Sequence, residues 1–238
     1  IILCAVFVLA AAGCAPTDDE STTIDVESIA VPLYDASSEA SGSSEPTASK
    51  INLPASSKST NGGNGVSSPT YIKGVLIVNK SYGLPASYAP GVDATAKSWL
   101  NKMFAAADKD GLDMWIASGY RSYQRQTQLY NNYVSQDGKA AADRYSARPG
   151  FSEHQTGLAF DINDPSDGFK GTDESKWLAA HCHEYGFIIR YPQSKECVTG
   201  FMYEPWHVRY VGTELAKQLH ASGQCLEEYL GVDSKYAD

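Results

Sequence analysis

The residues from Ser152 to Asp161 constrain the fold of this chain more than any other stretch. They read Ser-Glu-His-Gln-Thr-Gly-Leu-Ala-Phe-Asp, which places His154 seven positions before Asp161. Apolar residues alternate from Gly157 to Ile162, a pattern typical of a half-buried strand with the aspartate on the face opposite the apolar side chains. Gly157 allows a tight turn before the strand. We therefore expect the His154 imidazole to return beside Asp161.

A second segment, residues 204–207, reads Glu-Pro-Trp-His and adds another histidine and another carboxylate. His154, Asp161 and His207 together make a three-ligand zinc site with an open fourth position, as in catalytic zinc centres. Glu204 is then left for proton transfer. The alternative is a hydrogen-bonded His154–Asp161 pair and a core His207, which is the better explanation of any one residue alone. The whole set favours zinc.

These motifs resemble the VanY-type zinc D,D-carboxypeptidases, within the wider group that includes D-Ala-D-Ala dipeptidases. The resemblance covers residues 71–238 and includes four ordered segments: Ser-Gly-Tyr-Arg-Ser at 118–122, the histidine–aspartate stretch at 152–161, Tyr-Gly-Phe at 185–187 with Arg-Tyr-Pro at 190–192, and Glu-Pro-Trp-His at 204–207. It implies an α+β fold of the Hedgehog/DD-peptidase type, with one domain and an antiparallel sheet flanked by helices.

The resemblance also implies a substrate, the D-alanine-terminated stem peptide of peptidoglycan, and an arginine that faces it. Arg121 matches that arginine and stands at an expected strand-to-helix junction, where its forked donors suit a carboxylate or an oxyanion. A lone surface arginine is the alternative. Ser152 is a second candidate for substrate binding, and Gln126, in the first turn of the following helix, is expected to give structural support. Glu204 would accept the proton of the attacking water and pass it to the leaving amine.

The first fourteen residues are typical of a secretory signal. They are apolar and uncharged, and the small residues 11–13 precede Cys14. Small-small-Gly-Cys resembles the lipobox of bacterial lipoproteins, so we expect lipidation at Cys14 and an extracytoplasmic protein anchored to the outer face of the cell membrane. An ordinary cleaved signal with an incidental cysteine is the alternative.

Residues 15–70 are rich in serine and threonine and have one aromatic residue, Tyr34. Such a composition buries too little apolar surface to order the chain, so we expect a disordered tether. Eight acidic residues against Lys50 and Lys58 give this stretch most of the chain's net charge of −9. No basic patch for nucleic acid is present in the sequence.

Residues 71–238 have the length of one domain, and we expect a monomer. Periodicity and capping residues predict helices and strands alternating along it. The expected strands are 75–78, 112–118, 157–162, 187–191 and 206–211, and the expected helices are 94–110, 123–134, 137–145, 174–183 and 213–222. Pro205 predicts a bulge that lets Glu204 and His207 reach one pocket.

Other catalytic motifs fail in this sequence. A serine D,D-peptidase needs Ser-x-x-Lys, and no lysine here has a serine three residues before it. His183-Glu184 is not followed by the second histidine of His-Glu-x-x-His, because Phe187 stands there. The acidic loop 163–168 lacks the spacing of a calcium-binding EF-hand.

Two functions compete with D,D-carboxypeptidase activity. An L,D-carboxypeptidase would remove D-alanine from tetrapeptide stems with the same zinc motif, and a non-catalytic wall-binding module could keep the fold. Retention of the ligands and Glu204 argues against the second. The expected layout of the last strand and helix also predicts a Cys197–Cys225 disulfide, with Cys182 as a buried free thiol.

Overall fold

The computed structural model describes residues 65–237. The predicted signal segment and all but the end of the predicted tether lie outside the described residues. Thirteen helices and strands follow, with the bounds β1 (Thr70–Ile72), β2 (Val75–Ile77), α1 (Ala94–Lys109), β3 (Ile116–Ser118), α2 (Tyr123–Asp137), α3 (Lys139–Tyr145), β4 (Ala159–Ile162), α4 (Asp173–His181), β5 (Phe187–Tyr191), α5 (Glu196–Thr199), β6 (Glu204–Tyr210), α6 (Thr213–Ser222) and α7 (Leu226–Leu230). Short 3-10 helices are η1 (Glu153–Thr156), η2 (Asp167–Phe169) and η3 (Cys182–Tyr185).

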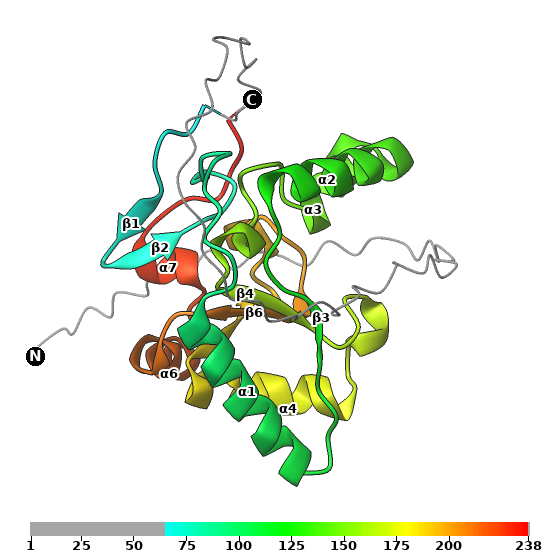
Figure 1. The fold of residues 1–238 in the computed structure, drawn as a ribbon, viewed down its shortest axis with the longest axis vertical. Helices are drawn as coiled ribbons and strands as arrows, with labels where there is room; N and C mark the ends of the chain where they lie inside the picture. The colour runs from blue at the N-terminus through cyan, green and yellow to red at the C-terminus, as the bar shows by residue number, and fades with distance from the viewer. Residues whose placement is uncertain (1–64, 238) are drawn as a thin grey trace, which may run out of the picture. The chain divides into compact units, whose positions relative to one another are not determined.

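An antiparallel sheet with the order β3-β4-β6-β5 organises the molecule, and β1 and β2 form a separate hairpin (Figure 1). Helices flank the sheet, so the predicted α+β fold is confirmed. No helix among residues 65–237 is long and apolar enough to cross a membrane.

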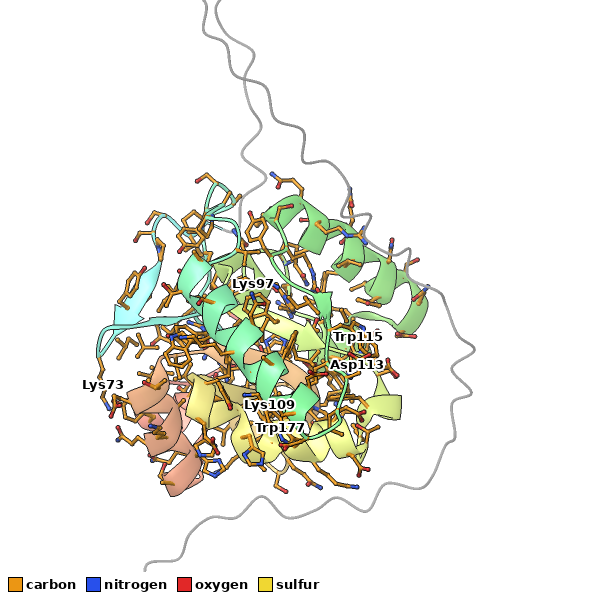
Figure 2. All side chains as sticks on the ribbon, turned by 60° about the horizontal axis from the view of Figure 1, so that its bottom comes forward. Lys73, Lys97, Lys109, Asp113, Trp115 and Trp177 are labelled. Atoms are coloured by element: carbon orange, nitrogen blue, oxygen red, sulfur yellow. The ribbon has the colours of Figure 1, made fainter. Side chains whose placement is uncertain are left out.

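One face of the sheet is apolar and packs on α1 and α4, which lie together below β4 and β6 in Figure 1. Alternation along the strands sends Phe160, Phe187, Trp206 and Val208 into this core. The C-terminal end of α1 is also joined to the middle of α4. The Trp177 Nε1–H donates to the Asp110 carboxylate just after α1 (2.7 Å), and Figure 2 shows Trp177 next to Lys109, the last residue of α1. The opposite face of the same strands therefore carries the polar side chains.

Helix α1 forms as predicted. The Asp93 side chain accepts a hydrogen bond from the Ala96 N–H (2.8 Å), an N-cap that satisfies one free donor of the first turn. The buried residues fall at helical spacing, and they are Ala96, Leu100, Met103 and Ala107. Ser122 caps α2 in the same way, with its Oγ 3.2 Å from the Arg125 nitrogen.

Several boundaries differ from the sequence prediction. The strand expected over 112–118 is limited to β3, because the Asn163 side chain bonds the backbone of Asp113 and Trp115 where a neighbouring strand would. Strand β4 is buried along its whole length rather than half-buried. Thr172, not Asp173, caps α4. The short elements β1, α5 and α7 were not predicted.

The predicted Cys197–Cys225 disulfide is wrong, because Cys225 is a free buried thiol. Cys225 is the N-cap of α7, and its N–H donates to the Glu228 carboxylate (2.9 Å) within a capping box. The sulfur therefore faces the first turn of its own helix. Cys182 is a buried free thiol, as predicted.

Candidate metal centre

His154 lies on η1, and the turn after it aims its ring at β4. Gly157 ends η1 with φ +74°, and a Cβ there would come within 1.9 Å of the Gly91 carbonyl oxygen, so only glycine fits. The His154 Nδ1–H donates to the Gly119 carbonyl (2.8 Å). This bond leaves Nε2 free, and it lies 3.1 Å from an Asp161 oxygen. The predicted return of the imidazole to Asp161 is confirmed.

Asp161 and His207 come from adjacent strands. They are directly paired in the register of β4 and β6, so their side chains lie on the same face of the sheet. The His207 Nδ1 is 3.0 Å from the second Asp161 oxygen. One ligand atom from each of His154, Asp161 and His207 lies within 4.8 Å of the others, and all three residues are buried.

These three residues fit zinc. Two imidazole nitrogens and one carboxylate oxygen are donors that zinc prefers, and three protein ligands leave one position open. The second nitrogen of each ring faces an oxygen, Gly119 O for His154 and the Glu153 carboxylate for His207, as is usual for zinc-bound histidines. The fold thus brings together the predicted ligands from two separate segments of the chain, residues 152–161 and 204–207.

The electrostatics of the cluster favour a cation. Although burial alone would lower the pKa of His207, its hydrogen bond to Asp161 and the nearby Glu153 carboxylate raise it to about 9. Burial likewise favours a neutral Asp161, but the two histidines hold the pKa of that carboxyl well below its ordinary range. His207 therefore keeps its second proton near neutral pH, and a metal ion would replace the proton on Nδ1.

Glu204 begins β6 beside the cluster without belonging to it. Its Oε2 lies 4.0 Å from the His207 Nδ1. Ile189 pairs with Val208 and Tyr191 with Glu204, so two steps along β5 match four along β6. This irregularity confirms the bulge predicted from the proline at 205. Burial raises the pKa of Glu204 to about 8, a value suited to proton transfer near neutral pH.

Arg121 faces the cluster from the end of β3. Its Nη2 lies 3.6 Å from Asp161, and it donates to the Ser118 hydroxyl at 2.9 Å. Nη1 donates to the Gln126 Oε1 (2.9 Å), and the Gln126 amide in turn donates to the Ala147 carbonyl (2.6 Å). The guanidinium is held in place while its side chain stays 20% exposed. The supporting role predicted for Gln126 is confirmed.

Ser152 is buried at the start of η1. Its backbone carbonyl accepts from the Gln155 N–H (3.2 Å), and its side chain makes no capping hydrogen bond to η1. Its proposed contact with substrate stays a prediction.

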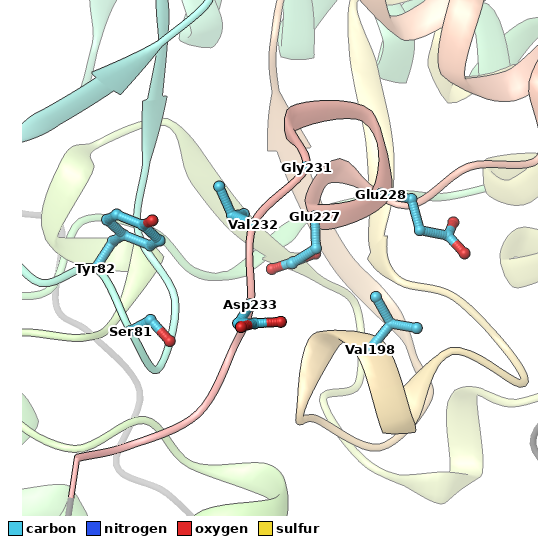
Figure 3. Close-up of a pocket in the computed structure, with 8 residues that line it drawn as sticks. All are labelled: Ser81, Tyr82, Val198, Glu227, Glu228, Gly231, Val232 and Asp233. Atoms are coloured by element: carbon cyan, nitrogen blue, oxygen red, sulfur yellow. The ribbon is translucent and has the colours of Figure 1, made fainter.

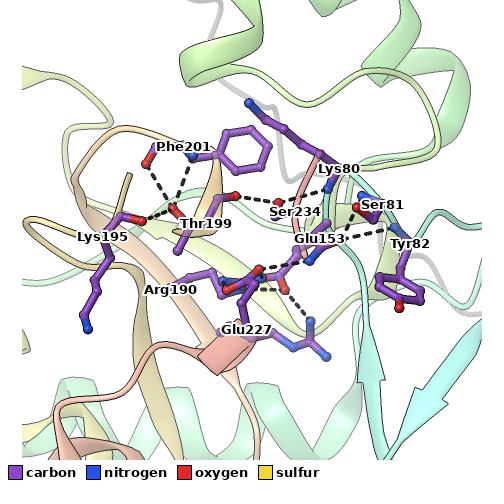
Figure 4. Close-up of polar contacts among 12 residues, drawn as sticks. Lys80, Ser81, Tyr82, Glu153, Arg190, Lys195, Thr199, Phe201, Glu227 and Ser234 are labelled. Carbon is purple, nitrogen blue, oxygen red and sulfur yellow. Dashed lines mark hydrogen bonds and ion pairs between the residues drawn. The ribbon is translucent and has the colours of Figure 1, made fainter. Parts of the chain in front are cut away.

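Sequence reasoning missed a buried charge network behind His207. Glu153, Arg190, Arg209 and Glu227 are all 0–1% exposed, and two acids against two arginines leave the group neutral. Arg190 donates to Glu153 at 2.8 Å and to both oxygens of Glu227 at 2.8 and 2.6 Å (Figure 4). Arg209 donates to Glu153 at 2.8 Å. The available signal was an arginine in each of two strands rich in apolar and aromatic residues, since a buried charge needs a partner.

A separate pocket of about 500 Å³ lies along α7 and the segment after it (Figure 3). Ser81, Tyr82 and Val198 line it with residues 227–228 and 231–233. None of the three candidate ligands borders it. It is therefore distinct from the metal centre.

Comparison with known proteins agrees with this geometry. The profile of the VanY family, described as D-alanyl-D-alanine carboxypeptidase, matches residues 90–213, which is more than half of the chain. The putative carboxypeptidase YodJ of Bacillus subtilis is 41% identical over 180 residues, 65% of this chain and 66% of that protein. A D-alanyl-D-alanine carboxypeptidase of Enterococcus faecalis is 37% identical over 177 residues, 67% of this chain and 66% of that protein. The match thus spans just under two thirds of these relatives' length.

Solved structures resemble the described domain closely. The LD-carboxypeptidase LdcB is 49% identical with a TM-score of 0.64, over 68% of this chain and 89% of that one. A vancomycin-resistance D,D-pentapeptidase VanY solved with Zn(II) is 38% identical with a TM-score of 0.59, over 65% and 97%. VanYB in complex with D-alanine-D-alanine is 38% identical with a TM-score of 0.60, over 66% and 96%.

Proposed function

Because the chain belongs to the VanY family of D-alanyl-D-alanine carboxypeptidases, we propose that it is a zinc-dependent D,D-carboxypeptidase. Its substrate would be a peptidoglycan stem peptide that ends in D-Ala-D-Ala, and the reaction would release the terminal D-alanine. One observation carries the proposal: a buried His154–Asp161–His207 cluster with an uncommitted carboxylate, Glu204, beside it. The VanYB complex with D-alanine-D-alanine supports the substrate class.

Zinc held by the three ligands would polarise the scissile carbonyl and lower the pKa of a water molecule. Glu204 would accept the proton of that water and pass it to the leaving amine. A bound cation nearby favours the ionised form of Glu204, which is the form that accepts a proton. The non-catalytic alternative has no use for such a base.

Arg121 would bind the negative charge of the substrate. Its guanidinium is anchored through Ser118 and Gln126, so the side chain would lose little conformational entropy when substrate binds. The guanidinium N–H groups can donate either to the terminal carboxylate of the substrate or to the oxyanion that develops at the scissile carbonyl. Both roles require a fixed positive charge beside the zinc ligands, which the 3.6 Å separation from Asp161 provides.

An L,D-carboxypeptidase is the second candidate, because the LdcB structure is 49% identical to this chain whereas the VanY structure is 38% identical. Incubation of the zinc-loaded protein with pentapeptide and tetrapeptide muropeptides, with products weighed by mass spectrometry, tests both candidates. The D,D-proposal expects loss of one alanine from the pentapeptide and slower or no loss from the tetrapeptide. The reverse ratio of kcat/KM supports the L,D-enzyme, and cleavage of neither peptide contradicts the proposed function.

We also propose that the protein is anchored outside the cell membrane through a lipid on Cys14. The support is the apolar segment 1–10, the small residues before Cys14 and the serine- and threonine-rich stretch that follows. Replacement Cys14→Ser should release the protein from the membrane fraction or leave it unprocessed. A variant that fractionates and migrates like the parent would contradict the anchor without bearing on the zinc site.

A further inference from the structure

Two buried polar atoms behind the metal centre face each other. The Glu153 Oε2 and the His207 Nε2 lie 3.6 Å apart, and within residues 65–237 neither has a hydrogen-bond partner. The separation is too short for a water molecule to sit in line between them. A buried carboxylate oxygen and an imidazole nitrogen left unpaired would cost stability, so their mutual approach requires an explanation.

The state of the carboxylate is settled by its other oxygen. Glu153 Oε1 accepts from Arg190 Nε and Arg209 Nη1, each at 2.8 Å. Both guanidinium groups are buried and positively charged, so these two hydrogen bonds pair them with a carboxylate anion. The oxygen that faces His207 therefore belongs to an ionised group, which can only accept a proton.

The state of the ring follows from its two nitrogens. Nδ1 lies 3.0 Å from an oxygen of the fellow ligand Asp161, whereas Nε2 faces Glu153, so Nδ1 is the nitrogen on the metal side of the ring. A neutral imidazole that gives its Nδ1 lone pair to a metal carries its proton on Nε2. The acceptor that faces this proton is the Glu153 carboxylate.

We propose that Glu153 is the positioning residue for His207: it accepts the Nε2–H, holds the ring with Nδ1 toward the metal, and strengthens that nitrogen as a ligand. The inference rests on the proposed zinc function and adds to it a group that touches neither metal nor substrate. Arg190 and Arg209 keep the carboxylate charged and in place. Partners of this kind are typically worth about 10–100-fold in metal affinity.

The chain supplies a matched control. Glu227 is as fully buried as Glu153 and bonds the same arginine, Arg190, through both of its oxygens. It also accepts from the Asn79 amide (3.2 Å). In the described structure no contact joins it to His207. Replacing either glutamate by glutamine removes one negative charge from the same network. Only Glu153→Gln changes the group that faces the His207 Nε2.

The experiment compares the zinc affinity of the wild-type protein, Glu153→Gln and Glu227→Gln by competition with a chelator of known affinity. Both variants should lower the thermal midpoint of the metal-free protein, because each leaves a buried arginine without a full partner. Zinc affinity should fall about 10–100-fold in Glu153→Gln and by less than about threefold in Glu227→Gln. Equal losses in the two variants, or no loss in Glu153→Gln, would overturn the proposal.

A second measurement is made on the wild-type protein and does not require Glu153→Gln to fold. In the zinc-loaded, ¹⁵N-labelled wild-type protein, the His207 Nε2–H proton should exchange slowly and resonate downfield, as a proton shared with a buried carboxylate does. The same signal should persist in Glu227→Gln. A rapidly exchanging proton at the shift of a solvated imidazole would refute the role of Glu153, whereas a wild-type protein that binds no zinc would refute the proposed function itself.

Discussion

At the scale of single residues, the metal ligands are the part of the site that could be predicted from the sequence. His154 and Asp161 belong to one short motif, so the glycine turn and the strand between them decide their approach. His207 was harder, because only the pairing of two strands places it opposite Asp161. The residue types helped to predict His207 as a ligand, since two histidines and an aspartate together are more typical of a metal site than of a structural role.

Glu153 could not be assigned in the same way, although it stands beside His154 in the motif. Its role depends on Arg190 and Arg209, which come from two other strands, and no spacing along the chain reveals such contacts. The Cys197–Cys225 disulfide failed for a related reason. The expected proximity of two segments does not determine the direction of a cysteine side chain. The Cys225 sulfur contacts the backbone of the first turn of α7 instead.

We predict that His154→Ala abolishes stoichiometric zinc binding and peptidase activity together, because a three-ligand site has no ligand to spare. Metal analysis after dialysis measures the first effect and a muropeptide assay the second. His181→Ala is the control, since the His181 side chain is 42% exposed and pairs with Glu184 rather than with the cluster. Stoichiometric zinc in His154→Ala would remove that residue from the site.

At the scale of helices and strands, capping residues and periodicity predicted most of the structure. Strand β5 and helix α6 have the expected bounds, and Asp93 and Ser122 are the expected caps. The failures are short elements, such as β1 and α7, whose few residues carry no periodic signal. Strand β1 forms by pairing with β2, and α7 forms because Leu226 and Leu230 are buried against other segments. The pattern of residues within a short segment does not reveal stabilisation by contacts with distant segments.

Gly157→Ala tests the turn that positions His154. The Cβ would meet the Gly91 carbonyl oxygen at 1.9 Å and φ is +74°, so we expect a loss of unfolding free energy well above the roughly 1 kcal/mol of left-handed strain alone, together with weaker zinc binding. Gly223→Ala is the control, because φ there is +65° with nothing within 4 Å of the new methyl group. Urea unfolding measures both variants. A smaller loss in Gly157→Ala than in Gly223→Ala would show that the turn is not constrained.

At the scale of the whole molecule, the metal-free protein should lose stability as pH rises from 7 to 9. The pKa of His207, about 9, and that of Glu204, about 8, are both raised above their ordinary values in the folded state. The folded protein therefore holds more protons than the unfolded chain in this range, and such stability is lost with rising pH.

Thermal midpoints in chelator at constant ionic strength measure this dependence. Zinc should reduce the decline, because a metal on the His207 Nδ1 replaces the proton whose loss drives it. The stabilisation by zinc should accordingly grow from pH 7 to pH 9. A midpoint that is flat or rises over this range without metal would contradict the charge state assigned to the empty cluster.

Glu204→Gln tests the central claim most directly. Glutamine keeps the size and the hydrogen-bonding oxygen of Glu204 but cannot accept a proton, and no ligand is removed. The account predicts unchanged zinc content, an intact fold and a fall in kcat of at least about 10²–10⁴-fold on the preferred muropeptide. Full activity of Glu204→Gln would contradict the mechanism, and zinc lost from Glu204→Gln but retained in Asp161→Asn would mean that ligand and base have been exchanged.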